Sequence, residues 1–269
     1  MTNKSIEIQP GMGVYKVFKH LKYKPWFAIA EFIDNSLQSF LSKDGKYGTT
    51  RSVCKVKIIY EPNDDFLSIE DNAFGISDSE HQRAFTAGNP PSDRSGLSEF
   101  GMGMKSASIW FSPNWKVTTQ SIDSDFEYQY TFDLDEVEKT NGKLTPEVNN
   151  FKSKKGFTKI ELNNLHNKLR TSTIKKIKDH LSSIYRCYLR SNKLEISFNE
   201  DDLRFEGPPV LKAVEAWPEG DKNEIIEWKK TISFSLSNGA SVSGFVAIRE
   251  KGSFAQAGLS LFRRYRLIE

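Results

Sequence analysis

Residues 25–41 have the apolar spacing of one long amphipathic helix, and the rest of the chain has to pack around it. Apolar side chains recur at steps of three and four residues, at Trp26, Ile29, Ile33, Leu37 and Phe40. A stripe of this kind packs on a hydrophobic core, and Pro25 suits the first turn of a helix. Glu31 and Asn35 are four residues apart, so they project from one face, one turn above the other.

This carboxylate and this amide lie beside a stripe that must be buried, which places them at the edge of a pocket. Together they have the chemistry to activate a water molecule and to hold a metal ion. The plainer interpretation is a helix cap or a solvated helix face, and for the pair alone it is the stronger one. The segments that follow decide between the two interpretations.

Composition places few limits on function. The 269 residues are 38% hydrophobic and 27% charged, as in an ordinary globular protein of one large or two medium domains. No apolar run approaches the roughly 20 residues of a membrane span, and the N-terminus lacks the apolar core of a secretion signal. Cys54 and Cys187 match no metal-ligand spacing, so we expect reduced thiols in a cytoplasmic protein. The net charge of +3 is too small to indicate a nucleic-acid partner.

A second polar segment follows a predicted antiparallel hairpin of strands 53–60 and 66–70. Asp71 ends the returning strand, and Gly75 and Ile76 follow shortly after it. An aspartate at a strand end, beside a glycine, can hydrogen-bond a flat heterocycle while the backbone approaches it closely. A simple Asx turn is the alternative, and it is the commoner structure for such residues in isolation.

A long segment rich in helix breakers, residues 87–96, leads into FGMGMKSAS at residues 100–108. Its length favours a functional lid or a disordered loop. Two glycines and a lysine at the start of a helical pattern suit a phosphate cradle, because exposed amides and the positive helix end attract anions. The order of residues matches neither a Walker A motif nor a dinucleotide fingerprint. Upstream, Ser77 and Glu80 have the spacing of a capping box.

Three segments together, EFIDN at 31–35, DNAFG at 71–75 and FGMGMKSAS at 100–108, resemble the motifs of the GHKL ATPases in order and spacing. This superfamily includes gyrase B, the HSP90-type chaperones, histidine kinases and MutL. Among its members, the Microrchidia (MORC) ATPases and their bacterial relatives are the most similar. A fourth segment, KGFTKIEL at 155–162, resembles the family's Gly-Thr strand, although Phe157 separates the glycine from the threonine.

The resemblance implies a Bergerat fold, an α+β two-layer sandwich in which helices cover a mixed, mostly antiparallel sheet. We expect a GHKL-type ATP-binding domain at residues 1–168 and a smaller transducer-like α/β domain at residues 169–269, truncated at its C-terminus as in a fragment of a longer protein. Further elements expected from periodicity are strands at 115–120 and 126–132, a polar loop or hairpin at 139–150, a helix capped by 171–173, and strands at 193–198, 225–236 and 241–249, the last two joined as a hairpin at Asn238-Gly239.

The resemblance also implies a role for each motif residue. Glu31 would be the general base for the water that attacks the γ-phosphate of ATP, and Asn35 would hold Mg²⁺, with Asp34 assisting from nearby. Asp71 would accept a hydrogen bond from the adenine amino group, and Gly75 would allow close approach to the base. The other nucleotide-binding candidates are Ile76 against the base, Gly101, Met102, Gly103, Met104, Lys105 and Ser106 around the phosphates under a lid at 84–103, Thr158 through its hydroxyl, and Lys251 as a transducer lysine.

Two residues depart from the family pattern. Ala73 stands where the family usually has glycine, so the turn at this position must avoid positive φ. Gln38 stands where many relatives carry an acidic residue. Neither change removes a catalytic group, so we expect slow hydrolysis.

The partners that the resemblance implies are ATP and, once ATP closes the lid, a second copy of the chain. DNA is a further expectation, because basic residues gather between 152 and 193, although a solvated helix face explains them more simply. The candidates for DNA contact are Lys175, Lys176, Lys178, Arg186 and Arg190. The alternative functions are a chaperone-like ATPase acting on protein and a nucleotide-sensing module without hydrolysis. No membrane partner is expected.

Overall fold

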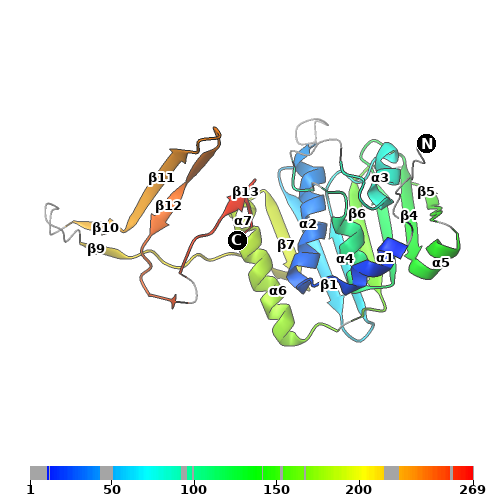
Figure 1. The fold of residues 1–269 in the computed structure, drawn as a ribbon, viewed down its shortest axis with the longest axis horizontal. Helices are drawn as coiled ribbons and strands as arrows, with labels where there is room; N and C mark the ends of the chain where they lie inside the picture. The colour runs from blue at the N-terminus through cyan, green and yellow to red at the C-terminus, as the bar shows by residue number, and fades with distance from the viewer. Residues whose placement is uncertain are drawn as a thin grey trace, which may run out of the picture. The chain divides into compact units, whose positions relative to one another are not determined.

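The chain forms two compact units in the computed structural model, which describes residues 11, 13–42, 51–91, 96–98, 100–140, 142–151, 154–166, 168–214, 224–254 and 257–268. The first unit extends to Phe205 and also takes in Phe262–Ile268, and the second comprises Glu206–Leu261. Figure 1 shows the elements of both.

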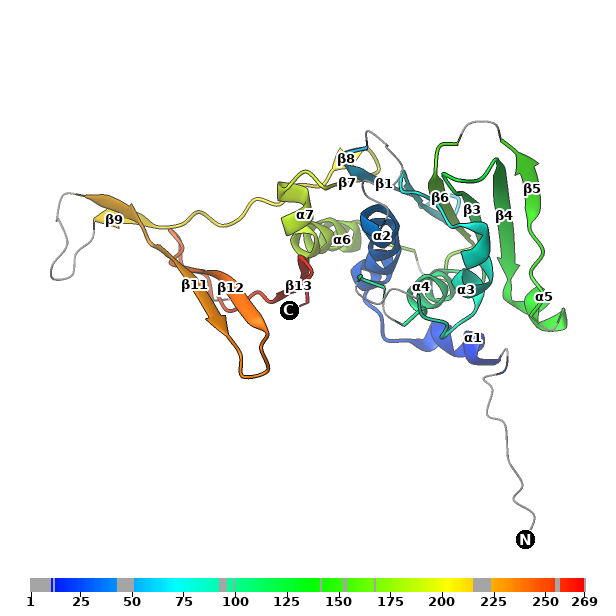
Figure 2. The same cartoon turned by 90° about the horizontal axis from the view of Figure 1, so that it is seen from above.

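Helices cover one face of a large sheet in the first unit (Figure 2). They are α1 (Gly13–Val17), η1 (Phe18–His20), α2 (Pro25–Ser42), η2 (Asp78–Glu80), α3 (His81–Phe85), α4 (Gly103–Phe111), α5 (Leu134–Lys139), α6 (Thr171–Ile184) and α7 (Arg186–Arg190). Helix α2 is the helix that the apolar spacing predicted, and Ile29, Ile33 and Leu37 of its stripe are fully buried.

The sheet has eight strands in the order β5-β4-β3-β6-β2-β1-β7-β8. They are β1 (Cys54–Glu61), β2 (Phe66–Asp71), β3 (Asn114–Gln120), β4 (Phe126–Asp133), β5 (Glu147–Asn150), β6 (Phe157–Asn163), β7 (Leu194–Phe198) and β8 (Asp201–Asp202). Neighbouring strands are antiparallel except β1 and β7, which are parallel. This mixed, mostly antiparallel sheet under helices confirms the predicted α+β two-layer sandwich.

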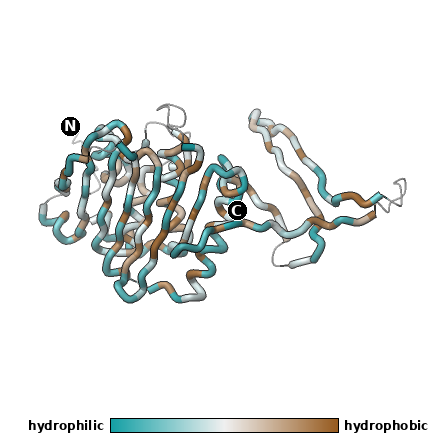
Figure 3. The backbone as a smooth tube through the Cα atoms, turned by 180° about the vertical axis from the view of Figure 1, so that it is seen from behind, coloured by the Kyte–Doolittle hydropathy of each residue, from teal (hydrophilic) through white to brown (hydrophobic). Residues whose placement is uncertain are grey.

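Alternating burial orients the strands of the sheet. In β1, Cys54, Val56 and Ile58 are buried, whereas Lys55 and Lys57 are exposed. Because successive side chains of a strand point to opposite faces, the apolar set faces the helices and the charged set faces outward. Figure 3 views the first unit from the open side of the sheet, where hydrophilic and hydrophobic positions alternate along the strands.

Several local predictions differ from the structure. Ser77 makes no side-chain cap for η2, because its hydroxyl contacts Ser79 while Glu80 forms an ion pair with Arg83, so the predicted capping box is wrong. Residues 171–173 were predicted to cap a helix, but they form the first turn of α6, and Arg170 occupies its N-cap position without a side-chain cap. Part of the segment predicted as a polar loop or hairpin forms the edge strand β5.

Residues 169–205, which the sequence assigned to a second domain, belong to the first unit. The buried side chains of α6 include Ile177, Leu181 and Ile184, and β7 extends the large sheet by pairing with β1. Helix α6 and strand β7 therefore pack in the same hydrophobic core as the rest of the first unit. The transducer-like assignment of residues 169–269 stays a prediction.

The second unit consists of small antiparallel pairs. Strand β9 (Lys212–Val214) pairs with β10 (Ile225–Glu227), and β11 (Lys229–Ser235) pairs with β12 (Ser241–Ala247). The turn of the second pair contains Asn238 and Gly239, which confirms the predicted hairpin. A last hairpin, β13 (Phe262–Arg263) and β14 (Arg266–Leu267), lies in the first unit. Within the described part of the chain, every helix is too short or too polar to cross a bilayer.

Candidate nucleotide-binding and active site

A cavity of about 380 Å³ lies beside α2, the end of β2 and the start of α4 in the first unit. We call it the nucleotide cavity. Its volume is within the usual range for a small-molecule site. Among the residues predicted from the sequence, those that line it are Asn35, Asp71, Gly75, Ile76, Gly101, Gly103, Met104, Lys105 and Thr158. The structure thus brings residues from all four sequence motifs to one place.

Asp71 is a fixed hydrogen-bond acceptor at one end of this cavity. Its Oδ2 accepts from Ser36 Oγ at 2.6 Å, and its Oδ1 accepts from the amides of Ala73 at 2.9 Å and Thr158 at 3.1 Å. Burial raises the pKa of Asp71 to about 6, against the opposing effect of these hydrogen bonds. A carboxylate has roughly four acceptor positions, so one remains for a ligand donor. Ser36 was not singled out from the sequence, although it follows directly on EFIDN.

Thr158 contacts Asp71 through its backbone amide, while its hydroxyl lies beside Thr119. In the sheet, Thr158 is paired with Asp71 on β2 and with Thr119 on β3. Its hydroxyl lies 3.2 Å from the Thr119 hydroxyl, which also accepts from Ile76 N at 3.0 Å and donates to Phe157 O at 2.9 Å. Sequence reasoning missed Thr119, since only the strand register brings it here.

Gly75 is required where the chain leaves β2. Its φ is +69°, and a Cβ at this position would lie 2.0 Å from the backbone oxygen of Gln120. Ala73, by contrast, is buried and is absent from the described residues with positive φ, as its side chain demands. Arg51, a residue that the sequence did not mark, donates to Asn72 O at 2.5 Å and to Ala73 O at 3.0 Å. These contacts hold the turn against the cavity.

The start of α4 forms the other end of the cavity and suits an anion. The first amides of a helix have no carbonyl partner within the helix and carry the positive end of its dipole. Gly101 has a φ of +62°, and a Cβ there would lie 2.0 Å from the backbone oxygen of Asn89. Lys105 Nζ donates to Ala84 O at 2.7 Å, and burial, with a smaller effect from Arg83, lowers the Lys105 pKa to about 8.

Two of the predicted phosphate-binding residues lie elsewhere. Ser106 is outside the lining of the nucleotide cavity, because its buried hydroxyl donates to Gly103 O at 3.1 Å and lies 3.2 Å from Tyr23 Oη. Met102, at the N-cap position of α4, lines a second cavity. Fewer residues of the motif therefore line the nucleotide cavity than the sequence predicted.

The second cavity, of about 310 Å³, contains Glu31 and Asp34 and is called the acidic cavity below. Gly101 and Gly103 line both cavities. Residues 101–103, called the glycine segment or the divider below, therefore separate the two cavities. The Glu31 carboxylate is in contact with this divider: a Cβ on Gly103 would lie 2.1 Å from Glu31 Oε2. Burial raises the pKa of Glu31 to about 7, with a further rise from Asp34 and an opposing effect from Arg266. A carboxyl group poised near neutrality is suited to act as a general base.

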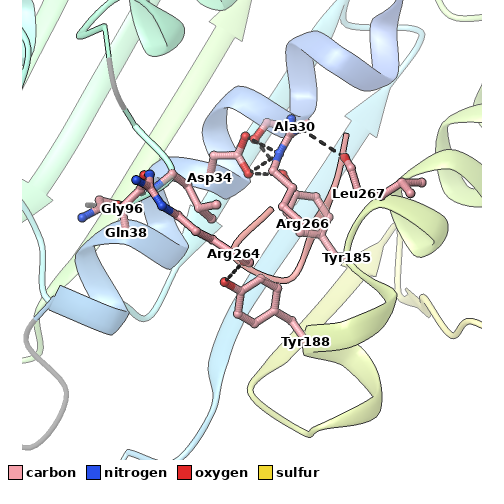
Figure 4. A network of polar contacts seen from close by, with 10 residues as sticks. Ala30, Asp34, Gln38, Gly96, Tyr185, Tyr188, Arg264, Arg266 and Leu267 are labelled. Carbon is pink, nitrogen blue, oxygen red and sulfur yellow. Dashed lines mark hydrogen bonds and ion pairs between the residues drawn. The ribbon is translucent and has the colours of Figure 1, made fainter. Parts of the chain in front are cut away.

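Asp34 is held by two residues that are distant from it in the sequence (Figure 4). Arg266 Nε lies 2.8 Å from Asp34 Oδ2 and 2.9 Å from Oδ1, and Tyr185 Oη donates to Oδ1 at 2.7 Å. Burial raises the pKa of Asp34, while Arg266 and Tyr185 oppose the rise. No sequence motif pointed to Arg266 or Tyr185.

Two other predicted residues have structural surroundings of their own. Lys251 is exposed in the second unit and lines neither cavity. Gln38 accepts from Leu97 N at 2.6 Å through its side-chain oxygen, so it fastens a described part of the predicted lid. Residues 92–95 and 99 of that lid lie outside the described residues.

The proposed DNA-contacting residues differ in their surroundings. Lys175 and Lys176 are exposed on α6. Lys178 pairs with Asp201 at 2.5 Å, and Arg186 lies over the ring of Phe262 at 4.5 Å. Arg190 lies over the ring of Phe205 at 5.0 Å. Three of the five cations are thus engaged within the first unit.

A family model described as "Histidine kinase-, DNA gyrase B-, and HSP90-like ATPase" matches residues 23–171, more than half of the chain. The matched stretch includes α2, the Asp71 turn, the glycine segment before α4 and Thr158. No curated protein matches the chain.

Proposed function

Because the chain belongs to the histidine kinase-, DNA gyrase B- and HSP90-like ATPase family, we propose that it binds ATP with Mg²⁺ in the nucleotide cavity and hydrolyses it slowly. The observation that carries this proposal is the contact between the Glu31 carboxylate and the glycine segment that starts α4. It puts a group with a pKa of about 7 next to the predicted phosphate cradle.

The two ends of the nucleotide cavity suit the two ends of ATP. Asp71 would accept from the adenine amino group, Gly75 would allow the base to approach the backbone, and Ile76 would pack against its face. The first amides of α4 would bind the phosphates, with Lys105 adding a positive charge at neutral pH.

The residues of the cavity fit a magnesium ion that arrives with the phosphates. Mg²⁺ prefers hard oxygen ligands and usually keeps waters and phosphate oxygens in its shell, so one side-chain oxygen from the protein is enough. Asn35 lines the cavity and offers an amide oxygen of this kind. Bound there, Mg²⁺ would neutralise phosphate charge.

Glu31 would take the proton from the attacking water, and the amides of the glycine segment would stabilise charge on the terminal phosphate. Glu31 is one helical turn from Asn35, on the same side of α2, so the proposed base is close to the proposed metal ligand. Near pH 7 about half of the Glu31 carboxyl groups are ionised, and only this fraction can accept the proton.

We further propose that ATP closes the lid, pairs two copies of the chain and lets the pair clamp DNA, as the resemblance to MORC, MutL and gyrase B implies. The exposed Lys175 and Lys176 support a salt-dependent contact with phosphates. A cytoplasmic location agrees with the free thiols of Cys54 and Cys187.

Titration with a non-hydrolysable ATP analogue, followed by calorimetry and light scattering, tests binding and pairing together, and phosphate release from ATP tests hydrolysis. We expect saturable, Mg²⁺-dependent binding, a doubling of the scattering mass and slow release. Absence of binding would refute the proposal. Binding without release would instead favour a nucleotide-sensing module.

Retention on duplex DNA tests the partner. Lys175→Glu with Lys176→Glu should weaken retention and flatten its salt dependence. The matched control is Lys55→Glu with Lys57→Glu, which reverses two exposed charges on β1. Equal retention in both double variants would remove DNA from the proposal and favour a chaperone-like ATPase.

A further inference from the structure

We propose that Arg266 is a positioning residue of the ATPase site: through Asp34, it fixes the turn of α2 that carries Glu31. The inference rests on the proposed function, since it concerns the same site. The sequence motifs place the residues of the site between 31 and 158. Arg266 would add a residue from the last described hairpin of the chain.

The contact between Arg266 and Asp34 joins the last hairpin to the middle of α2 (Figure 4). The Arg266 Nε lies within 2.9 Å of both carboxylate oxygens of Asp34, whose side chain is only 9% exposed. Tyr185 Oη donates to Asp34 Oδ1 at 2.7 Å and to Ala30 O at 2.9 Å. Because hydrogen bonds from two sides hold the buried Asp34 carboxylate, they also fix the orientation of the turn of α2 that carries it. The neighbouring side chains of that turn are thereby held in place.

Glu31 is three residues from Asp34, and the two carboxyl groups line the same cavity. Residues at this spacing are neighbours on a helix surface. Because Glu31 also touches the divider at Gly103, a small rotation of this turn would move its carboxylate along the cradle. Misplacement of a reacting group by about 1 Å can cost on the order of 100-fold in rate.

The hairpin that carries Arg266 has anchors of its own. Arg264 and Tyr265 have φ of +51° and +61°, a pair typical of a tight hairpin turn. Tyr188 Oη donates to Arg264 O at 2.7 Å, and the Arg264 guanidinium donates to Gly96 O, within the predicted lid. Arg266 is thus held on a fixed element and not on a free end.

The charges around the two carboxyl groups explain why Arg266 matters to protonation as well. Those that face Glu31 or Asp34 are Tyr23 before α2, Tyr185 and Tyr188 from α6–α7, and Arg263, Arg264 and Arg266 from the last hairpin. Burial raises the pKa of Glu31, whereas Arg266 lowers it. Loss of Arg266 would therefore make Glu31 hold more protons at neutral pH.

The position of the hairpin that carries Arg266 would therefore affect the rate of hydrolysis. The hairpin follows the second unit in the sequence and lines the acidic cavity, not the nucleotide cavity. Displacement of this hairpin would lower kcat while ATP still binds.

Steady-state hydrolysis by Arg266→Gln, Arg266→Lys and Asp34→Asn tests the role. For Arg266→Gln we expect kcat to fall at least ~10-fold with KM within about threefold of wild type, and for Arg266→Lys a partial recovery. Asp34→Asn removes the negative neighbour of Glu31 and leaves Arg266, so the acidic limb of its kcat profile should move to lower pH. The control Lys55→Gln, which breaks an exposed ion pair with Glu195, should keep wild-type kinetics.

A wild-type kcat in Arg266→Gln, or a defect confined to KM, would overturn the inference. Thermal unfolding checks each variant. If Arg266→Gln does not fold, Asp34→Asn with Arg266→Gln, which leaves no unpaired charge, takes its place, and a wild-type kcat in this double variant overturns the inference as well.

A second readout needs no nucleotide. Carbon NMR titration of the Glu31 carboxyl group in the nucleotide-free chain should show that Glu31 binds more protons at neutral pH in Arg266→Gln than in wild type. An unchanged titration refutes the coupling. If wild type releases no phosphate while this titration behaves as expected, the proposed hydrolysis fails and the ion-pair coupling stands.

Discussion

Glu31 and Gly103 meet where the two cavities of the first unit adjoin, and the missing side chain of Gly103 makes room for the carboxylate. A Cβ on Gly103 would lie 2.1 Å from Glu31 Oε2 and 3.4 Å from Glu31 Cβ. The glycine that opens α4 therefore also sets the place of the proposed base. In the proposed function, this one residue would serve both phosphate binding and hydrolysis.

Gly103→Ala should reduce kcat more than ATP affinity. The new methyl group would push the Glu31 carboxylate away from the divider, and a displacement of about 1 Å is worth on the order of 10- to 100-fold in rate. Phosphate release and binding of a non-hydrolysable analogue, measured on the same preparation, check this. A variant that loses affinity and keeps kcat would contradict the account.

Turnover should depend on pH with a maximum between about 7 and 8. Glu31 has a pKa of about 7 and must be ionised to accept a proton, so kcat/KM should rise as the pH passes through this value. Lys105 has a pKa of about 8 and loses its charge above it, so phosphate binding should weaken at higher pH. A pH–rate profile of the wild type checks both limbs, and a flat acidic limb would exclude Glu31 as the base.

Asp71→Asn should weaken nucleotide binding strongly. The amide side chain of this variant would replace a carboxylate that accepts from the Ala73 and Thr158 amides and, in the complex, from the adenine amino group. Hydrogen bonds to a charged group contribute about 1.5–3 kcal/mol each. Calorimetry with the ATP analogue should show a dissociation constant raised at least ~10-fold. Ser36→Ala, which removes only one donor to Asp71, is the milder comparison. An unchanged constant in Asp71→Asn would refute the adenine assignment.

Gly75→Ala should destabilise the first unit more than Gly88→Ala. Both glycines have positive φ, at +69° and +73°, so both variants incur the backbone cost of about 1–2 kcal/mol. Only at Gly75 would the new Cβ meet backbone, 2.0 Å from Gln120 O, whereas nothing lies within 4 Å at Gly88. Thermal unfolding should show the larger drop for Gly75→Ala, and equal drops would contradict the close packing of this turn.

Patterns between residues that are close in the sequence predicted the helices, strands and turns that carry much of the candidate site. The spacing of Ile29, Ile33 and Leu37 predicted α2, and turn residues predicted the hairpin that delivers Asp71. Gly101 and Gly103 predicted the helix start that α4 has at Gly103. In each case the residues that determine the structure are close together in the sequence, so propensity and periodicity were sufficient.

Contacts between distant strands and helices could not be predicted in this way. Arg266 and Asp34 are 232 positions apart, and nothing in the composition near either residue specifies the partner. Thr119 reaches Thr158 only through the register of β3 with β6. The strand pairing also assigns β7 to the first unit, because β7 pairs with β1, which is more than 130 positions earlier in the chain.

The central claim is that the Glu31 carboxyl group, beside the glycine segment of the nucleotide cavity, is the base that activates water on bound ATP. The most direct measurement compares Glu31→Gln with wild type in phosphate release and in binding of a non-hydrolysable ATP analogue. The account predicts a dissociation constant within about threefold of wild type and a kcat lowered by on the order of 100-fold or more. Wild-type turnover in Glu31→Gln would contradict it.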